Sequence, residues 1–176
     1  MVVKLSDSDA PQSYNIVLGA DGARSTVRKS LEIAFPGETL NQKIYLADYE
    51  FEDKNRDYFE GNFGNPETFL LFPVNKKVIR LIANFPDLET YAKKVCKMKL
   101  GRKVWESSFQ LNNRYAEKMN VGGVFLAGDS AHVHAPIGGR GMNLGIEDAF
   151  VFSELLKANK LEDYSLVRMP VVKNFV

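Results

Sequence analysis

The stretch from Val121 to Leu156 constrains the fold more than any other part of this 176-residue chain. It begins with a short apolar run, Val124 to Ala127, which predicts a buried strand. A glycine, a carboxylate and then a loop dense in glycine follow. A helix is expected next, because residues recur at helical spacing on one face, which comprises Ile146, Phe150, Ser153 and Leu156. A strand, a glycine-rich loop and a helix in this order form a cradle for a ligand.

The residue types in this cradle indicate the kind of ligand it would hold. Gly128 lets a ligand approach the backbone closely, and Asp129 is a strong acceptor for hydroxyl groups. Gly138, Gly139 and Gly141 leave backbone N–H groups that can point at an electron-rich group ahead of the helix N-terminus. The alternative for the glycines is a tight turn without a ligand. For Asp129 the alternative is a helix or loop cap.

The same stretch resembles the Gly-Asp motif of the FAD-dependent monooxygenases of the p-hydroxybenzoate-hydroxylase type, which are aromatic hydroxylases. In that family the motif reads approximately Gly-Asp-Ala-Ala-His, then Pro-x-Gly-Gly-x-Gly-Met/Leu-Asn-x-Gly, then Asp-Ala. The matching residues, in order and at the same spacing, are Gly128, Asp129, Ala131, His132, Pro136, Gly138, Gly139, Gly141, Met142, Asn143, Gly145, Asp148 and Ala149. So many ordered matches favour a cofactor site over a plain turn.

The resemblance also implies roles for single residues of this motif. Asp129 would bind a ribityl hydroxyl of FAD. Backbone groups around Gly141, Met142 and Asn143 would bind the pyrimidine edge of the flavin, where negative charge builds on reduction and a helix N-terminus stabilises it. The remaining cofactor-binding residues that we predict in this motif are Pro136 and Gly139.

A second stretch, Gly19 to Arg28, resembles the same family's Asp-Gly motif, Gly-Ala-Asp-Gly-x-x-Ser-x-Val-Arg. A buried strand would deliver Asp21 to a glycine-lined turn beside the pyrophosphate of the cofactor, and Ser25 can cap the following helix. In the family this motif is associated with FAD and with the nicotinamide donor, so we predict that Asp21 and Arg28 bind the cofactor. For Arg24 and Arg28 the alternative is solvated surface charge.

The rest of the sequence predicts short strands separated by segments that interrupt regular structure. Met1–Leu5 and Tyr14–Leu18 predict a hairpin, and 34–41 reads as a breaker segment that leaves the cofactor domain. Further strands are expected at Ile44–Phe51, Thr68–Phe72, Val78–Phe85 and Trp105–Leu111, with a helix over Leu88–Leu100. The end, Leu161 to Val176, resembles the family's Tyr-x-x-x-Arg-x-Pro-Val helix.

These elements predict an α/β fold, or α+β for this fragment: a partial FAD-binding domain with an inserted antiparallel substrate-domain sheet. Residues 1–35 and 112–176 would form the partial FAD-binding domain, and 36–111 the substrate-domain-like sheet. A complete family member also carries a βαβ unit with Gly-x-Gly-x-x-Gly, and that motif is absent before Asp21. We therefore expect a truncated protein that lacks the N-terminal half of the cofactor domain.

The composition limits the kinds of partner that we expect for this chain. The 23 basic and 22 acidic residues give a net charge of +1, which gives no reason to expect nucleic acid or an anionic membrane. Cys96 is the only cysteine, so no intramolecular disulfide forms. The start of the chain turns polar too early for a signal peptide, and no apolar run reaches membrane-spanning length, so a cytoplasmic protein is expected.

Other candidate sites have a simpler interpretation. His132 and His134 lack a third metal ligand nearby, so we predict no metal site, and His132 matches a family position of structural use. The aromatic residues Phe59, Phe63, Phe69, Phe72 and Phe85 either line a substrate cavity or form a core. We identify no catalytic acid or base, because in this family oxygen transfer belongs to the cofactor.

The function implied is the C-terminal portion of an FAD-dependent monooxygenase, an oxidoreductase that uses NAD(P)H and O2 to hydroxylate an aromatic or similar small organic substrate. We expect the isolated chain to be inactive. One alternative is a flavin-free remnant that acts as a binding module and self-associates through the surface that the missing half would cover. Another is a flavin halogenase or prenyl reductase, which shares both motifs.

Overall fold

The computed structural model describes residues 2–3, 10–51, 60–64, 66–135 and 139–176. The chain divides into two compact units, one formed by residues 1–39 and 112–176 and the other by residues 40–111. Helices and antiparallel strands both occur, as the α+β prediction for this fragment requires. None of the helices in the described part of the chain is long and apolar enough to cross a membrane.

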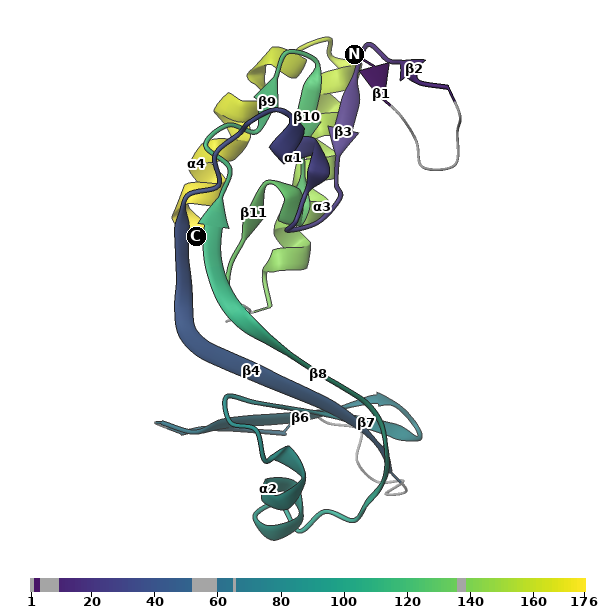
Figure 1. Cartoon of the computed structure of the whole chain (residues 1–176), viewed down its shortest axis with the longest axis vertical. Coiled ribbons are helices and arrows are strands. Elements are labelled where there is room, and N and C mark those ends of the chain that lie inside the picture. Colours follow the sequence, from purple (N-terminus) through teal and green to yellow (C-terminus); the bar gives the residue numbers. More distant parts are fainter. Residues whose placement is uncertain (1, 4–9, 52–59, 65, 136–138) are drawn as a thin grey trace. The chain divides into compact units, whose positions relative to one another are not determined.

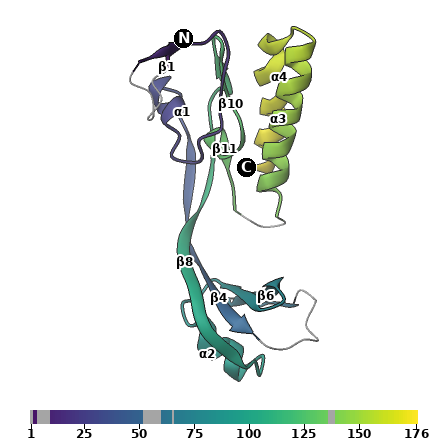
Figure 2. The same ribbon diagram turned by 90° about the vertical axis from the view of Figure 1, so that its right-hand side faces the viewer.

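The first unit is built on a small sheet of order β3-β10-β9. Its central strand β10 runs parallel to β3 and antiparallel to β9, and all three of its residues are buried. Figure 2 shows α1 on one side of this sheet and α3 with α4 on the other. The bounds are β3 Val17–Gly19, α1 Thr26–Ser30, β9 Asn120–Val121, β10 Val124–Leu126, α3 Gly141–Lys157 and α4 Tyr164–Phe175.

Aromatic rings form the centre of this unit's core. Tyr164, at the start of α4, is fully buried, and its ring meets those of Phe125 and Phe152 edge-on at centroid distances of 5.7 and 5.9 Å. The Tyr164 hydroxyl donates a hydrogen bond to the backbone oxygen of Leu126 at 3.0 Å. The core therefore ties both C-terminal helices to β10, the strand that leads into the glycine-rich loop.

The apolar face predicted for α3 lies at the surface of this unit. Ile146, Phe150 and Leu156 are all exposed, whereas the buried side of α3 carries Leu144 and Asp148. A buried carboxylate within an otherwise apolar interface needs charged or hydrogen-bonding partners. Asp148 therefore requires an explanation from the site itself.

The second unit holds an antiparallel sheet in the order β8-β4-β7-β6-β5 and one short helix, α2 (Figure 1). The strands are β4 Gly37–Phe51, β5 Glu60–Phe63, β6 Thr68–Asn75, β7 Val78–Ala83 and β8 Leu100–Tyr115, and α2 is Leu88–Lys94. Strands β4 and β8 extend past the limits of this unit at one end. Small strands outside the sheet are β1 Val2–Val3 and β2 Gln12–Ser13, and β11 His132–Val133 pairs with the end of β8 in the first unit.

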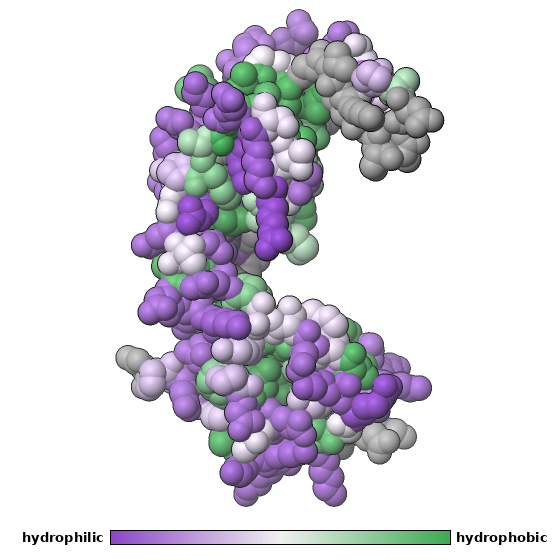
Figure 3. Space-filling view, in the orientation of Figure 1, coloured by the Kyte–Doolittle hydropathy of each residue, from purple (hydrophilic) through white to green (hydrophobic). Residues whose placement is uncertain are grey.

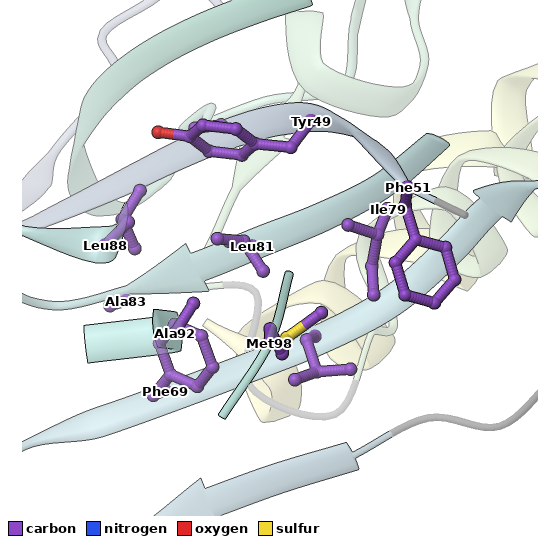
Figure 4. Packing of buried hydrophobic residues seen from close by; sticks show 11 residues of the cluster. Tyr49, Phe51, Phe69, Ile79, Leu81, Ala83, Leu88, Ala92 and Met98 are labelled. Carbon is purple, nitrogen blue, oxygen red and sulfur yellow. The ribbon is translucent and has the colours of Figure 1, made fainter. Parts of the chain in front are cut away.

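Alternation along these strands gives the sheet one buried face. The register places Ala47 beside Leu81 and Leu71 beside Leu81, and all three side chains are buried. Figure 4 shows this cluster, in which Leu88 and Ala92 of α2 join the strand residues. Leu81 is 0% exposed. Hydrophilic residues cover much of the visible face of this unit in Figure 3, as expected for its outer surface.

The aromatic residues that the sequence places in a cavity lining or in a core differ in their burial. Phe69 is buried, and its ring stacks on Phe85 and lies 4.7 Å from the ring of Tyr91, so both phenylalanines belong to the core. Phe72 is half-buried. Phe59 lies outside the described residues, and the side chain of Phe63 does too.

Three predicted boundaries are wrong. Strand β3 overlaps the predicted segment Tyr14–Leu18 only at Val17 and Leu18 and pairs with β10, while the short hairpin forms between β1 and β2. The predicted breaker at 34–41 gives way to β4 from Gly37, because β8 offers a long partner strand. The predicted helix Leu88–Leu100 ends at Lys94, and Lys97 then takes a left-handed φ of 52°, which a helix does not accept.

Candidate functional site

The turn after β10 presents a carboxylate that has no partner in the part of the chain that the structure describes. Gly128 has a φ of 60°, in the left-handed region that glycine adopts without steric cost, and the next residue, Asp129, is exposed. Among the described residues, none donates a hydrogen bond to the Asp129 carboxylate. A polar group held at the surface without a partner is available to a ligand that carries hydroxyl groups.

The first turn of α3 lies open beside a second glycine turn. Gly139 has a φ of 64°, and a Cβ atom built there would meet no atom of the described residues within 4 Å. Helix α3 starts at Gly141, and its N-cap residue Arg140 makes no side-chain capping bond. Met142 is 74% exposed and Asn143 is also exposed. The first backbone N–H groups of a helix have no partner within it, so this end suits an electron-rich ligand.

Behind this surface lies a buried charged network. Asp148 of α3 is 0% exposed, and its Oδ2 accepts hydrogen bonds from Gly128 N at 2.9 Å and from His132 Nε2 at 2.6 Å. Its Oδ1 accepts from Nε of Arg168 on α4 at 2.7 Å. His132 is 1% exposed, and its Nδ1 has no partner among the described residues. An ionised carboxylate can only accept, so Nε2 carries the hydrogen in this contact and the ring orientation is fixed by Asp148.

The Asp-Gly segment forms a closely bonded loop in front of α1. Asp21 accepts from Ser25 Oγ at 2.5 Å and from the backbone N–H groups of Thr26 and Val27 at 2.6 and 3.1 Å. Burial alone would raise the pKa of Asp21, but these hydrogen bonds outweigh it and lower the pKa below its ordinary value. Ser25 caps α1 by accepting from Arg28 N at 2.9 Å, which confirms the predicted cap.

Arg28 joins the two motif segments. Its guanidinium donates to the backbone oxygen of Ser130 at 2.7 Å and to that of Ala23 at 2.8 Å, and it lies 3.7 Å above the ring of Phe35. Arg28 is 4% exposed, so the alternative of solvated surface charge is wrong for this residue. Burial lowers its pKa below the ordinary value, and the nearby Asp21 partly offsets that effect.

The residues predicted to bind the cofactor thus differ in where the structure places them. Asp129 and Gly139 lie on two exposed turns, and Gly141, Met142 and Asn143 form the first turn of α3. The side chains of Asp21 and Arg28 are bonded to the protein, and their predicted contacts with the cofactor stay a prediction. Pro136 lies outside the described residues.

Sequence reasoning gave no role to three residues that organise the site: Ser130, Asp148 and Arg168. Ser130 is fully buried, and its hydroxyl donates to Gly19 O at 2.6 Å and lies 2.8 Å from Ala127 O. For Asp148 a signal was present, since it is one of the residues that match the Gly-Asp motif. Among the described residues, no group of three or more His, Cys, Asp or Glu side chains is arranged to hold a metal ion.

Comparison with known proteins decides the family. Residues 87–174, half of the chain, match the protein family described as FAD binding domain. The chain belongs to this FAD-binding family. FAD is accordingly the cofactor to which its motifs correspond, and the resemblance to FAD-dependent aromatic hydroxylases and monooxygenases is confirmed.

Several relatives carry the same region within longer chains. Rifampicin monooxygenase of Streptomyces venezuelae is 33% identical over 85% of this chain and 35% of its own length. A flavin-dependent monooxygenase of Mycobacteroides abscessus is 32% identical over 96% of this chain and 41% of its length. The crystal structure of CabE, an aromatic hydroxylase from angucycline biosynthesis, matches with a TM-score of 0.76 and 30% identity over 98% of this chain and 40% of that one. This FAD-binding family member therefore spans about two fifths of these relatives or less.

Proposed function

We propose that this chain forms the FAD- and substrate-contacting part of a flavin-dependent monooxygenase. NAD(P)H and O2 would be the co-substrates, and the product would be a hydroxylated aromatic or similar small organic molecule. The relatives named above are monooxygenases or an aromatic hydroxylase, which supports this reaction class over a halogenase or prenyl reductase. The observation that carries the proposal is the exposed Asp129 carboxylate, which has no partner among the described residues, at a turn fixed by Gly128.

The residues present fit the chemistry of FAD. Its ribityl chain carries hydroxyl donors, which the Asp129 carboxylate can accept, and the left-handed Gly128 leaves no side chain on that turn. Its isoalloxazine ring gains negative charge on reduction, and the N-terminus of α3 at Gly141 places partial positive charge nearby on the chain. When bound, FAD supplies the redox and oxygen chemistry, and the protein supplies binding, orientation and electrostatics.

The chain's own residues would then have separate tasks. Asp129 would orient the cofactor through hydroxyl groups, and the backbone N–H groups at Gly141, Met142 and Asn143 would stabilise negative charge. The Asp21 loop, whose carboxylate is bonded within the protein, would present its backbone to the pyrophosphate. The unit of residues 40–111 would be the substrate domain. We further propose that the protein is cytoplasmic.

The test is a visible absorbance spectrum of the purified chain before and after addition of FAD and desalting. A retained flavin band near its usual blue and near-ultraviolet positions supports the proposal, and NAD(P)H oxidation assays then follow. Asp129→Ala should lose most of the retained band, whereas Glu162→Ala, at an exposed carboxylate without a described partner, should keep it. A chain that stays colourless after FAD contradicts cofactor binding by this chain.

A second candidate function is a flavin-free module that binds through an apolar surface. It is favoured by the exposed face of α3, where Met142, Ile146 and Phe150 are 74%, 59% and 66% exposed. Contiguous apolar surface of this kind promotes association. Sedimentation of the chain distinguishes the two functions: a colourless oligomer that Phe150→Ser converts to a monomer supports the module, whereas a monomer that retains flavin opposes it.

A further inference from the structure

The buried network around Asp148 connects α3 with three other parts of the chain. One carboxylate accepts from the backbone of Gly128 at 2.9 Å, from His132 on β11 at 2.6 Å and from Arg168 on α4 at 2.7 Å. Arg168 also lies within hydrogen-bonding distance of Leu144 O at 3.4 Å. The turn after β10, the start of the following segment and both C-terminal helices therefore meet at a single side chain.

Stability alone is a weak reason for such a network. A buried ion pair costs desolvation energy that its attraction only roughly repays, and well-packed apolar residues of similar volume often serve as well. A charged group that holds a backbone N–H does fix a geometry that apolar packing leaves loose. The contact to Gly128 is of this kind, since it joins Asp148 to the backbone of the turn itself.

The turn that Asp148 holds is also crowded from the same side. Gly128 has a φ of 60°, and a side chain built at Gly145, one turn before Asp148 on α3, would lie 3.3 Å from the Gly128 Cα atom. The hydrogen bond and the close approach of two glycines set the distance between the turn and α3. Asp129 is the next residue, and its exposed carboxylate takes its direction from that turn.

We propose that Asp148 is a positioning residue for the candidate cofactor site. It acts through Gly128 to direct the Asp129 carboxylate toward the ribityl hydroxyl groups, while His132 and Arg168 hold Asp148 in place. The identity of the ligand rests on the proposed function; the control of the turn by Asp148 does not.

A double-mutant cycle on the full chain tests this proposal. FAD affinity is measured by flavin fluorescence for the wild type, Asp148→Asn, Asp129→Ala and the double variant. Asp148→Asn should weaken binding about tenfold, in line with the loss of one charge-assisted hydrogen bond. It should weaken binding little further when Asp129 is already alanine, because the effect passes through Asp129. Glu154→Gln, on the exposed side of α3, is the matched control and should bind as the wild type does.

Losses that simply add in the double variant, or an unchanged affinity in Asp148→Asn, would overturn the proposal. Amide hydrogen exchange at Gly128 gives a readout independent of FAD: its protection should fall in Asp148→Asn while that of Leu126 persists. If the wild type binds no FAD, the proposed function fails, and Gly128 exchange alone then decides whether Asp148 holds the turn. If Asp148→Asn does not fold, Arg168→Lys takes its place, with the same direction of change expected at Gly128.

Discussion

The guanidinium Nη1 of Arg28 lies 2.7 Å from the backbone oxygen of Ser130, so two sequence motifs 102 residues apart share one buried hydrogen bond. Arg28 stands at the end of the Asp-Gly segment, and Ser130 follows Asp129 in the Gly-Asp segment. The carbonyl of Ser130 is thereby fixed from the α1 side, while Asp148 fixes Gly128 from the α3 side. The turn between the two contacts carries Asp129, which is how buried contacts control an exposed carboxylate.

Replacing Arg28 should therefore cost much stability. Arg28→Met keeps the aliphatic part of the side chain but removes the guanidinium, so the oxygens of Ser130 and Ala23 lose their donor, and we expect a loss of about 3 kcal/mol in the free energy of unfolding. Urea denaturation measures the loss. Arg24→Met is the control at an exposed neighbouring arginine and should change stability by less than about 0.5 kcal/mol. Equal effects of the two substitutions would contradict the assigned role of Arg28.

Alanine substitutions at two glycine turns can distinguish the stability cost of a strained backbone from an effect on the geometry of the site. Gly128 and Gly122 have similar φ values, 60° and 55°, so alanine at either position should cost about 1–2 kcal/mol in stability. Only Gly128→Ala disturbs the turn that carries Asp129, and only that variant should lose FAD affinity. Thermal unfolding and flavin fluorescence of the two variants provide the comparison. A similar loss of flavin affinity in Gly122→Ala would show that general destabilisation is the cause.

Local patterns predicted the surface of the site well. The apolar run before Gly128, the glycine-rich loop and the helical spacing after it gave β10, the turn and α3, and Ser25 gave the cap of α1. These features depend on residues close in sequence, where turn and cap chemistry act directly. The family assignment followed from the same ordered residues.

The interior of the site could not be predicted in the same way. Asp148 and Arg168 lie on different helices, and only tertiary packing shows that they meet. Periodicity also does not name a partner strand: the sequence predicts a hairpin for Tyr14–Leu18, although Val17 and Leu18 pair with β10, more than 100 residues later. Nor does a helical pattern tell which of two apolar faces is buried, as Ile146 and Phe150 show.

The hydrogen bonds to Asp21 should make the free energy of unfolding depend on pH in the acidic range. The pKa of Asp21 is lower in the folded chain than its ordinary value of 3.8, so folding favours the ionised carboxylate. This contribution is present above pH 3.8 and is lost as pH falls through the lower folded pKa. The difference in unfolding free energy between the wild type and Asp21→Asn should shrink as pH falls below about 4. Ser25→Ala removes one donor to Asp21 and should weaken this pH dependence; an unchanged difference from pH 7 to pH 3 would contradict it.

Tyr49, in the second unit, should ionise at a much higher pH than an ordinary tyrosine does. Burial, and then the nearby Glu89 carboxylate, which accepts from the Tyr49 hydroxyl at 3.2 Å, raise the pKa of Tyr49 to about 12. The neutral phenol is favoured in the folded chain, so its contribution to stability is complete below pH 10 and is lost as pH rises to about 12. Tyrosinate absorbance, as the difference between the wild type and Tyr49→Phe, isolates this group. Glu89→Gln should lower the pKa of Tyr49, because it removes the neighbouring negative charge while leaving a hydrogen-bond acceptor in place. A difference titration centred near pH 10 would show that the Tyr49 hydroxyl is neither desolvated nor paired with Glu89 in solution.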